Sequence, residues 1–130
     1  MAVRVGIDLV DVESVETSVR THAERYLERV YTEAEVRDCS TEAGVDSERL
    51  AARFAAKEAT MKVLRVADEG VSWRAIEVRR DPAGWVDLHL TGKAADLAEQ
   101  AGLEGFSVSL THEKGFASAV VVAEIGRPCR

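Results

Sequence analysis

The sequence is poor in cysteine, proline and aromatic residues. Its 130 residues include two cysteines, two prolines and 5% aromatic residues. The two cysteines, Cys39 and Cys129, lie far apart in the chain, which excludes a disulfide-rich scaffold and a zinc site of closely spaced cysteines. There is no apolar run long enough to span a bilayer, and no basic and apolar leader at the N-terminus. These absences predict a cytoplasmic protein that has reduced thiols and does not associate with membranes.

Basic residues are outnumbered by acidic ones. The chain has 17 Lys and Arg against 23 Asp and Glu, for a net charge of -6. Nucleic-acid binding is therefore not expected, because a phosphate backbone is recognised by a basic surface. Hydrophobic residues make up 46% of the chain, enough for the core of one domain of this length. We expect one domain over residues 1–130, with 126–130 as a flexible tail.

Strands and helices are interspersed along the chain, and most strand pairs are joined as hairpins. The patterning predicts helices over 12–20, 22–30, 32–39, 46–66 and 91–100, and strands over 3–12, 73–80, 85–90, 107–113 and 116–124. Residues 40–45 are expected to form a poorly ordered loop. This order predicts an α+β fold in which a mainly antiparallel sheet packs on one long helix.

The long helix carries the most informative motif, Arg53–Lys62, which reads RFAAKEATMK. Glu58 and Lys62 are four residues apart and therefore lie on one face of the helix. Arg53 and Lys57 add two cations about one turn earlier. One acid among three bases suits a phosphate ester or pyrophosphate whose charge is shared between a metal ion and protein cations. The alternative is an exposed helix with an ordinary ion pair between residues four apart.

A second acid, Asp8, lies inside the apolar run of residues 3–12. A carboxylate in such a run is costly unless a cation satisfies it. Asp8 and Glu58 together would be two oxygen ligands from distant elements, a common arrangement for Mg²⁺ when phosphate oxygens complete the coordination. The alternative is that Asp8 pairs with Arg4 or caps a nearby helix.

The last hairpin contributes a histidine at the end of a strand. Residues 107–113 alternate apolar and polar side chains and end in His112 and Glu113, and a buried strand follows the Lys114–Gly115 turn. His112 is either a functional residue or a packed structural histidine. Trp73 and Trp85 are interpreted as core or rim aromatics.

Together, the opening GIDLVDV, the helix motif RFAAKEATMK and the hairpin SVSLTHEKGF resemble the holo-acyl-carrier-protein synthases, which are small 4'-phosphopantetheinyl transferases. The resemblance covers nearly the whole chain. It implies Mg²⁺-dependent transfer of 4'-phosphopantetheine from coenzyme A to a serine of an apo acyl carrier protein of the fatty-acid or polyketide type. Adenosine 3',5'-bisphosphate would be released.

The resemblance also implies residue roles and an assembly. Mg²⁺ would be held by Asp8 and Glu58, and catalysis would depend on Glu58, Lys62 and His112. The expected coenzyme A contacts are Arg53, Lys57, Lys62 and His112. A homotrimer is implied, with the ligand in a cleft between neighbouring subunits.

Three places depart from that family's pattern. One is the strand that usually begins with an Asp-Ile-Glu triplet, which reads Arg74-Ala75-Ile76-Glu77 here. Ser14 stands where members usually carry an arginine that docks the carrier, and the glycine expected after the helix motif arrives only at Gly70. Together with the negative net charge, these departures predict a non-standard carrier, such as one from secondary metabolism. Two alternatives remain open at this point: a non-catalytic module that binds coenzyme A and carrier proteins, and a different Mg²⁺-dependent phosphotransferase or phosphoester hydrolase.

Overall fold

The structure is a computed structural model that describes residues 1–67 and 70–126. Its helices are α1 (Val12–His22), α2 (Glu24–Val30), α3 (Glu33–Asp38), α4 (Ser47–Leu64) and α5 (Gly92–Gln100), with the 3₁₀ turn η1 (Trp73–Ala75). Its strands are β1 (Ala2–Asp11), β2 (Ser40–Thr41), β3 (Gly44–Val45), β4 (Ile76–Arg80), β5 (Val86–Leu90), β6 (Leu103–Glu113) and β7 (Phe116–Ile125). The predicted tail at 126–130 lies, apart from Gly126, outside the described residues.

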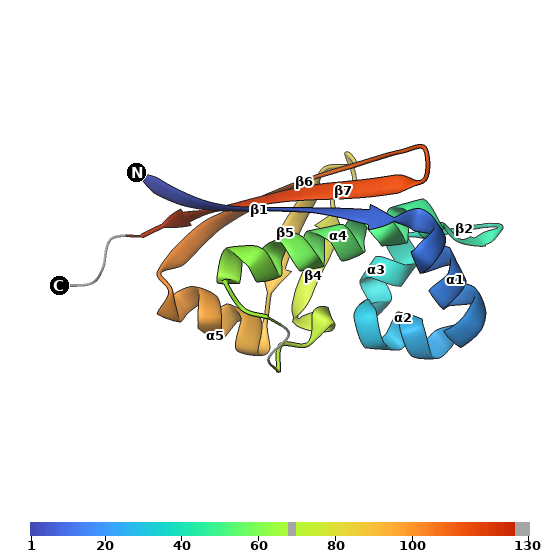
Figure 1. Ribbon diagram of the computed structural model, residues 1–130, viewed down its shortest axis with the longest axis horizontal. Helices are drawn as coiled ribbons and strands as arrows, with labels where there is room; N and C mark the ends of the chain where they lie inside the picture. Colours follow the sequence, from blue (N-terminus) through green and yellow to red (C-terminus); the bar gives the residue numbers. More distant parts are fainter. Residues whose placement is uncertain (68–69, 127–130) are drawn as a thin grey trace.

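The main sheet is antiparallel and has the order β1-β7-β6. It lies across α4, with helices α1, α2 and α3 at one end of the molecule and α5 at the other (Figure 1). The β4–β5 hairpin flanks α4 on the side of β6. This arrangement confirms the predicted α+β fold with an antiparallel sheet packed on one long helix. None of the helices in the described ranges is long and apolar enough to cross a membrane.

The local chemistry of the sequence accounts for where the helices begin. Asp46 caps α4, because its carboxylate accepts hydrogen bonds from the backbone of Glu48 and Arg49. Thr32 and Glu35 form a reciprocal capping box at the start of α3. The loop predicted over 40–45 is wrong in part, because β2 and β3 form a short hairpin there.

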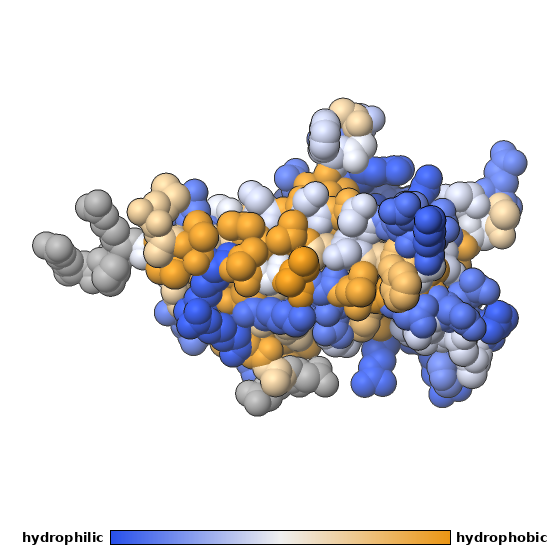
Figure 2. Space-filling view, turned by 45° about the horizontal axis from the view of Figure 1, so that its top comes forward, coloured by the Kyte–Doolittle hydropathy of each residue, from blue (hydrophilic) through white to orange (hydrophobic). Residues whose placement is uncertain are grey.

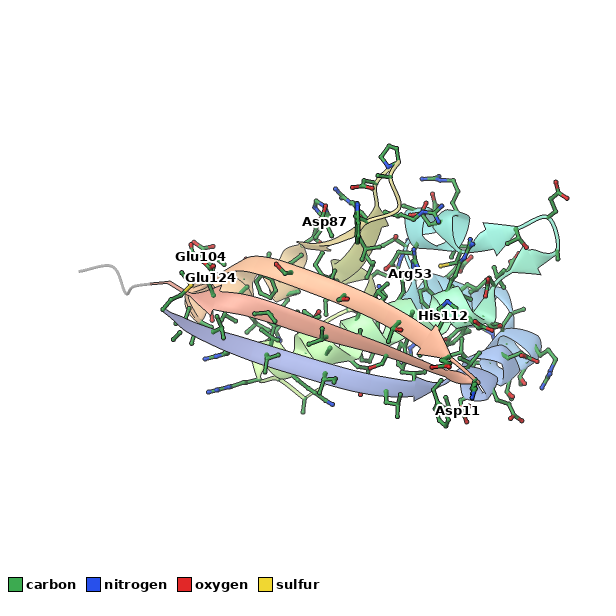
Figure 3. All side chains as sticks on the ribbon, turned by 90° about the horizontal axis from the view of Figure 1, so that it is seen from above. Asp11, Arg53, Asp87, Glu104, His112 and Glu124 are labelled. Carbon is green, nitrogen blue, oxygen red and sulfur yellow. The ribbon has the colours of Figure 1, made fainter. Side chains whose placement is uncertain are left out.

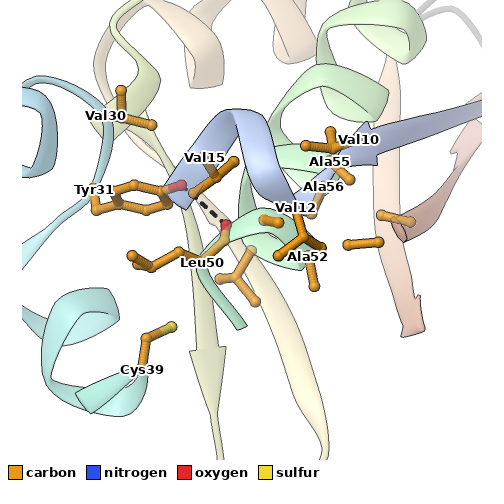
Figure 4. Close-up of a cluster of buried hydrophobic side chains, with 14 residues drawn as sticks. Val10, Val12, Val15, Val30, Tyr31, Cys39, Leu50, Ala52, Ala55 and Ala56 are labelled. Carbon is orange, nitrogen blue, oxygen red and sulfur yellow. Dashed lines mark hydrogen bonds between the residues drawn. The ribbon is translucent and has the colours of Figure 1, made fainter. Parts of the chain in front are cut away.

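The core is built around α4, whose buried face is rich in alanine. The small side chains of Ala51, Ala55 and Ala59 let the sheet approach the helix closely, and Val10 and Val121 pack on them from the strands. Close packing of this kind makes the position of the helix sensitive to the size of every residue at the contact. The Tyr31 hydroxyl donates to the backbone oxygen of Leu50, 3.0 Å away, and so ties α2 to the start of α4 (Figure 4).

Gly6 is the point of closest approach between β1 and α4. A Cβ atom at this position would lie 2.1 Å from the backbone oxygen of Ala59, a contact that neither backbone can relieve without moving. The side chains on the same face of β1 lie along the helix, and the Arg4 Nη1 atom donates to the Val63 oxygen at 3.1 Å. Gly6 therefore sets the spacing between β1 and α4.

We predict that Gly6→Ala destabilises the protein by about 1–3 kcal/mol, the usual cost of overpacking a tight contact. The cost arises because β1 must move away from α4. Urea denaturation followed by circular dichroism measures the effect, with Ser107→Ala on the exposed face of β6 as the control. An unchanged denaturation midpoint would mean that the strand separates from the helix at no cost.

Candidate active site

Asp8 and Lys62 form an ion pair between β1 and α4. The Lys62 Nζ atom lies 3.3 Å from Asp8 Oδ1 and also donates to the Ile7 backbone oxygen at 2.7 Å. The Asp8 side chain is 18% exposed and that of Lys62 is 54% exposed, so the pair lies at the surface with the ammonium on the outside. Asp8 pairs with neither of its expected alternatives, since Arg4 bonds to α4 and the cap of α1 is Asp11.

Glu58 lies one turn before Lys62 on the same face of α4 and is half-buried. The strand and the helix run in opposite directions, because Arg4 contacts Val63 while Gly6 contacts Ala59. The next inward-facing residue of β1, Asp8, therefore lies beside the turn that carries Glu58. The structure thus pairs Asp8 with Lys62 and places the pair beside the turn of Glu58, and a shared metal and catalytic site at these residues stays a prediction.

The residues at this site fit a magnesium ion that shares its coordination with a substrate. Within residues 1–67 and 70–126 there is no cluster of three or more metal-binding side chains, so a cage built entirely from protein is absent there. Mg²⁺ is commonly held by one or two carboxylates together with water and substrate phosphates. Asp8 and Glu58 supply that number, and the ammonium beside Asp8 shows that this carboxylate accepts a cationic neighbour.

The structure contradicts the prediction that Lys57 contacts coenzyme A. Lys57 has no exposed surface, and its Nζ atom donates to Glu35 Oε1 at 2.7 Å and to the backbone oxygens of Ile76 and Trp73. Burial lowers the pKa of the Lys57 ammonium, and the Glu35 carboxylate opposes that shift. With its donors directed into the core, Lys57 is a structural residue that joins α4 to α3 and β4.

A second site lies between the start of α4, the β4–β5 hairpin and β6. This site, here called the arginine cleft, has a volume of about 360 Å³, and its polar lining includes Arg49, Arg53, Arg80 and His112. Arg53 is 4% exposed, and its buried Nε atom has no hydrogen-bond partner in the described structure. A buried guanidinium with one unsatisfied nitrogen, placed among further cations, is an anion-binding feature.

His112 and the Asp8–Glu58–Lys62 group lie apart within one chain. The Nδ1 atom of His112 lies 2.6 Å from a Glu48 carboxylate oxygen, at the first turn of α4. Glu58 follows Glu48 by ten residues, which is about 15 Å of helix. Figure 3 shows His112 and Arg53 on the side of β6, whereas β1, which carries Asp8, forms the opposite edge of the sheet.

Sequence reasoning missed part of the arginine cleft. Arg80 and Trp85 come from the β4–β5 hairpin, on either side of the turn that contains Pro82 and Gly84. The pattern of an arginine before the turn and a tryptophan after it was the available signal. That pattern alone does not indicate a binding site, because the place of the hairpin beside Arg53 depends on the tertiary fold.

Comparisons with known proteins agree on one family. The model of the 4'-phosphopantetheinyl transferase superfamily matches residues 4–121, and the chain therefore belongs to this superfamily. The holo-[acyl-carrier-protein] synthase of Koribacter versatilis is 40% identical over 125 residues, which cover 95% of this chain and 99% of the relative. The family prediction made from the sequence is confirmed.

Solved structures show the same relationship. A Chronobacterium ammoniagenes ACPS–CoA complex matches with a TM-score of 0.84 and 32% identity, covering 98% of this chain and 100% of that one. The Helicobacter pylori holo-[acyl-carrier-protein] synthase in complex with coenzyme A matches with a TM-score of 0.81 and 30% identity, covering 93% and 100%. Both similar proteins were solved with coenzyme A bound.

Proposed function

We propose that this protein is a holo-[acyl-carrier-protein] synthase, with residues 1–130 forming one transferase domain. It moves 4'-phosphopantetheine from coenzyme A to a serine of an apo acyl carrier protein in the cytoplasm. The observation that carries the proposal is the Asp8–Lys62 ion pair where β1 crosses α4, beside the turn that carries Glu58. Membership of the superfamily and the coenzyme A complexes of similar proteins support it.

The reaction breaks one phosphorus–oxygen bond and forms another. The serine oxygen attacks the β-phosphorus of the pyrophosphate in coenzyme A, and the bond from that phosphorus to the bridging oxygen breaks. Adenosine 3',5'-bisphosphate leaves, and phosphopantetheine stays on the serine. Such a reaction depends mainly on positioning and on stabilising the charge of the transferring group.

Each residue has a role that follows from its place. Asp8 and Glu58 would hold Mg²⁺, which when bound neutralises negative charge on the pyrophosphate. Glu58 accepts the proton of the serine hydroxyl as general base. The Lys62 ammonium is 54% exposed and turns from Asp8 to a phosphate oxygen when the substrate binds, so that it stabilises the charge that develops there.

The arginine cleft suits the other end of coenzyme A. Arg49, Arg53, Arg80 and His112 would bind the phosphates of the adenosine 3',5'-bisphosphate part. A cleft on the β6 side and a catalytic group at the β1 edge serve one ligand most simply if they come from neighbouring subunits. Arg53 and His112 therefore remain proposed ligand contacts, contributed by the chain next to the one that supplies Glu58.

The outer face of β1 supports an oligomer. Val3, Val5, Ile7 and Leu9 alternate with the inward residues of the strand and are between 54% and 65% exposed. Hydrophobic residues form a continuous band on this face of the molecule (Figure 2). An apolar strand at the edge of a sheet is normally covered by another chain. We propose that it is covered by further copies of this chain in a homotrimer.

The homotrimer proposal predicts that Ile7→Lys dissociates the assembly without unfolding the protomer, because Ile7 is 63% exposed within one chain. Analytical ultracentrifugation measures the mass, with Gln100→Lys on exposed α5 as a control of equal charge. The wild type and the control should sediment as trimers, and Ile7→Lys as a monomer with little activity. A monomeric wild type with full activity would refute the shared site.

The carrier is proposed to be of the fatty-acid or polyketide type. Its docking surface is proposed to be less acidic than that of the usual carriers. At the start of α1, Ser14 Oγ lies 3.4 Å from Asp11 Oδ2, and Glu13 and Glu16 are exposed nearby. Acidic residues at this end of α1 repel an acidic partner. A carrier with a less acidic docking helix fits this surface better.

The proposed function is tested by intact mass spectrometry of apo carrier proteins incubated with this protein, coenzyme A and Mg²⁺. The expected result is a gain of one phosphopantetheine that is lost when Mg²⁺ is removed by a chelator. A panel of carriers of differing charge ranks the partners. Coenzyme A binding without any gain in mass would favour a non-catalytic module, and release of inorganic phosphate would favour a hydrolase.

A further inference from the structure

Trp85 is the feature of the arginine cleft that phosphate binding does not explain. It lines the cleft, yet its side chain is 77% exposed. A large aromatic side chain on the surface leaves apolar area in water, and its burial by a partner or ligand would be favourable. The other tryptophan, Trp73, packs against Phe54 with ring centroids 5.2 Å apart and already has a structural role.

The backbone at Trp85 is held in place at the end of the β4–β5 turn. The Trp85 nitrogen donates to Asp81 Oδ1 at 3.0 Å, and the Asp81 nitrogen donates to the Trp85 oxygen at 2.9 Å. Gly84, with φ of +96°, provides the left-handed backbone that closes this turn. The indole ring is therefore presented from a fixed point on the rim of the cleft.

The cations of the cleft and the indole can recognise different parts of a nucleotide. Guanidinium groups bind phosphates of any ester and do not distinguish what is attached to them. An aromatic face stacks on a planar base, and this stacking adds both affinity and a preference for a large ring system. A cationic cleft with an exposed indole at its rim thus has the chemistry of a nucleotide site rather than that of a simple phosphate site.

We propose that Trp85 stacks on the adenine base of coenzyme A and makes binding to the arginine cleft selective for a purine nucleotide. This inference rests on the proposed function, because it assigns the adenosine 3',5'-bisphosphate end of coenzyme A to the cleft. It adds a specificity residue from the β4–β5 hairpin to the phosphate contacts of Arg53 and His112. Trp85 touches the base, and the transferring phosphorus is held elsewhere.

The test uses the full-length protein in its native assembly, with Trp73→Phe as the background so that Trp85 is the remaining tryptophan. Adenosine 3',5'-bisphosphate is expected to quench the fluorescence of Trp85 at saturation, and pyrophosphate is expected to leave it unchanged. Uridine 3',5'-bisphosphate is expected to bind more weakly, because its ring offers less area for stacking.

Variants of Trp85 separate stacking from phosphate binding. Calorimetry should find that Trp85→Leu raises the Kd for adenosine 3',5'-bisphosphate about tenfold, the scale of one lost base–aromatic stack. Trp85→Phe, which keeps an aromatic face, should stay within about threefold of the parent. The Kd for pyrophosphate should be the same in all three proteins. Since Trp85 is 77% exposed, these changes leave the core untouched.

The outcomes separate this proposal from the proposed function. If transfer to carrier proteins occurs but Trp85→Leu changes neither the Kd for the bisphosphate nor the KM for coenzyme A, the stacking proposal is wrong and the function stands. If no carrier is modified but bisphosphate binding depends on an aromatic residue at 85, the nucleotide site stands without the transferase. Equal loss of affinity for pyrophosphate and the bisphosphate in Trp85→Leu would also overturn the proposal.

Discussion

Replacement of Glu58 by glutamine is expected to lower the rate of phosphopantetheine transfer by about a thousandfold or more, within the range known for loss of a general acid or base. The substitution keeps the size of the side chain and removes its charge. It therefore removes both the proposed base for the serine proton and one of two carboxylates available to Mg²⁺. Single-turnover transfer to an apo carrier, followed by mass spectrometry, measures the effect.

The control for this experiment is Glu99→Gln, an equal change of charge on the exposed surface of α5. It should match the wild type in rate, and both variants should melt within a few degrees of the wild type. The transfer rate of Asp8→Asn should fall as that of Glu58→Gln does, because the substitution removes the other carboxylate and the negative charge that pairs with Lys62. Transfer at a normal rate by either site variant would refute the catalytic and metal-binding roles proposed for Asp8 and Glu58.

The fold and the group at the β1–α4 crossing could be predicted from the sequence because they follow from local signals. Asp46 caps α4, and the spacing of Glu58 and Lys62 fixes their common face whatever packs around them. Asp8 was informative since an acid in an apolar strand needs a cation, and the structure supplies Lys62. The sequence suggested Mg²⁺ as that cation, with Arg4 as the alternative. Lys62 was not expected, because pairing across 54 residues of sequence is not visible from local patterns.

The role of Lys57 could not be predicted, because it depends on contacts with distant parts of the chain. Arg53 and Lys57 are one turn apart and look equivalent as cations of the helix motif. In the structure, the turn with Arg53 lines an open cleft, while α3 and β4 cover Lys57. The partner of Lys57 is Glu35, 22 residues earlier, whose spacing from Thr32 indicates a helix cap and nothing about Lys57.

The Lys57–Glu35 pair is the polar centre of the core, and every charge in it is satisfied. Glu35 accepts from Lys57 and from the backbone nitrogens of Thr32 and Val78, at distances between 2.7 and 3.0 Å. Both side chains have no exposed surface. A buried pair of this kind contributes little net stability compared with apolar residues, but removal of one partner leaves an uncompensated charge.

Lys57→Met is therefore expected to destabilise the protein by about 3–5 kcal/mol, the cost of breaking a buried ion pair from one side. Methionine keeps an unbranched side chain that lacks only the terminal ammonium, so the loss comes mainly from the unpaired Glu35 carboxylate and from the carbonyls of Ile76 and Trp73. Chemical denaturation gives the free energy of unfolding. Lys114→Met, in the exposed β6–β7 turn, is the matched control and should stay close to the wild type.

A double variant, Glu35→Leu with Lys57→Met, shows how much of this loss comes from the uncompensated charge. It removes both charges, so it should be more stable than Lys57→Met alone, as apolar replacements of buried pairs often are. It should still fall short of the wild type, because Thr32 and Val78 lose their acceptor and two carbonyls lose their donor. If Lys57 contacted coenzyme A instead, Lys57→Met would raise the KM for coenzyme A and leave the free energy of unfolding nearly unchanged.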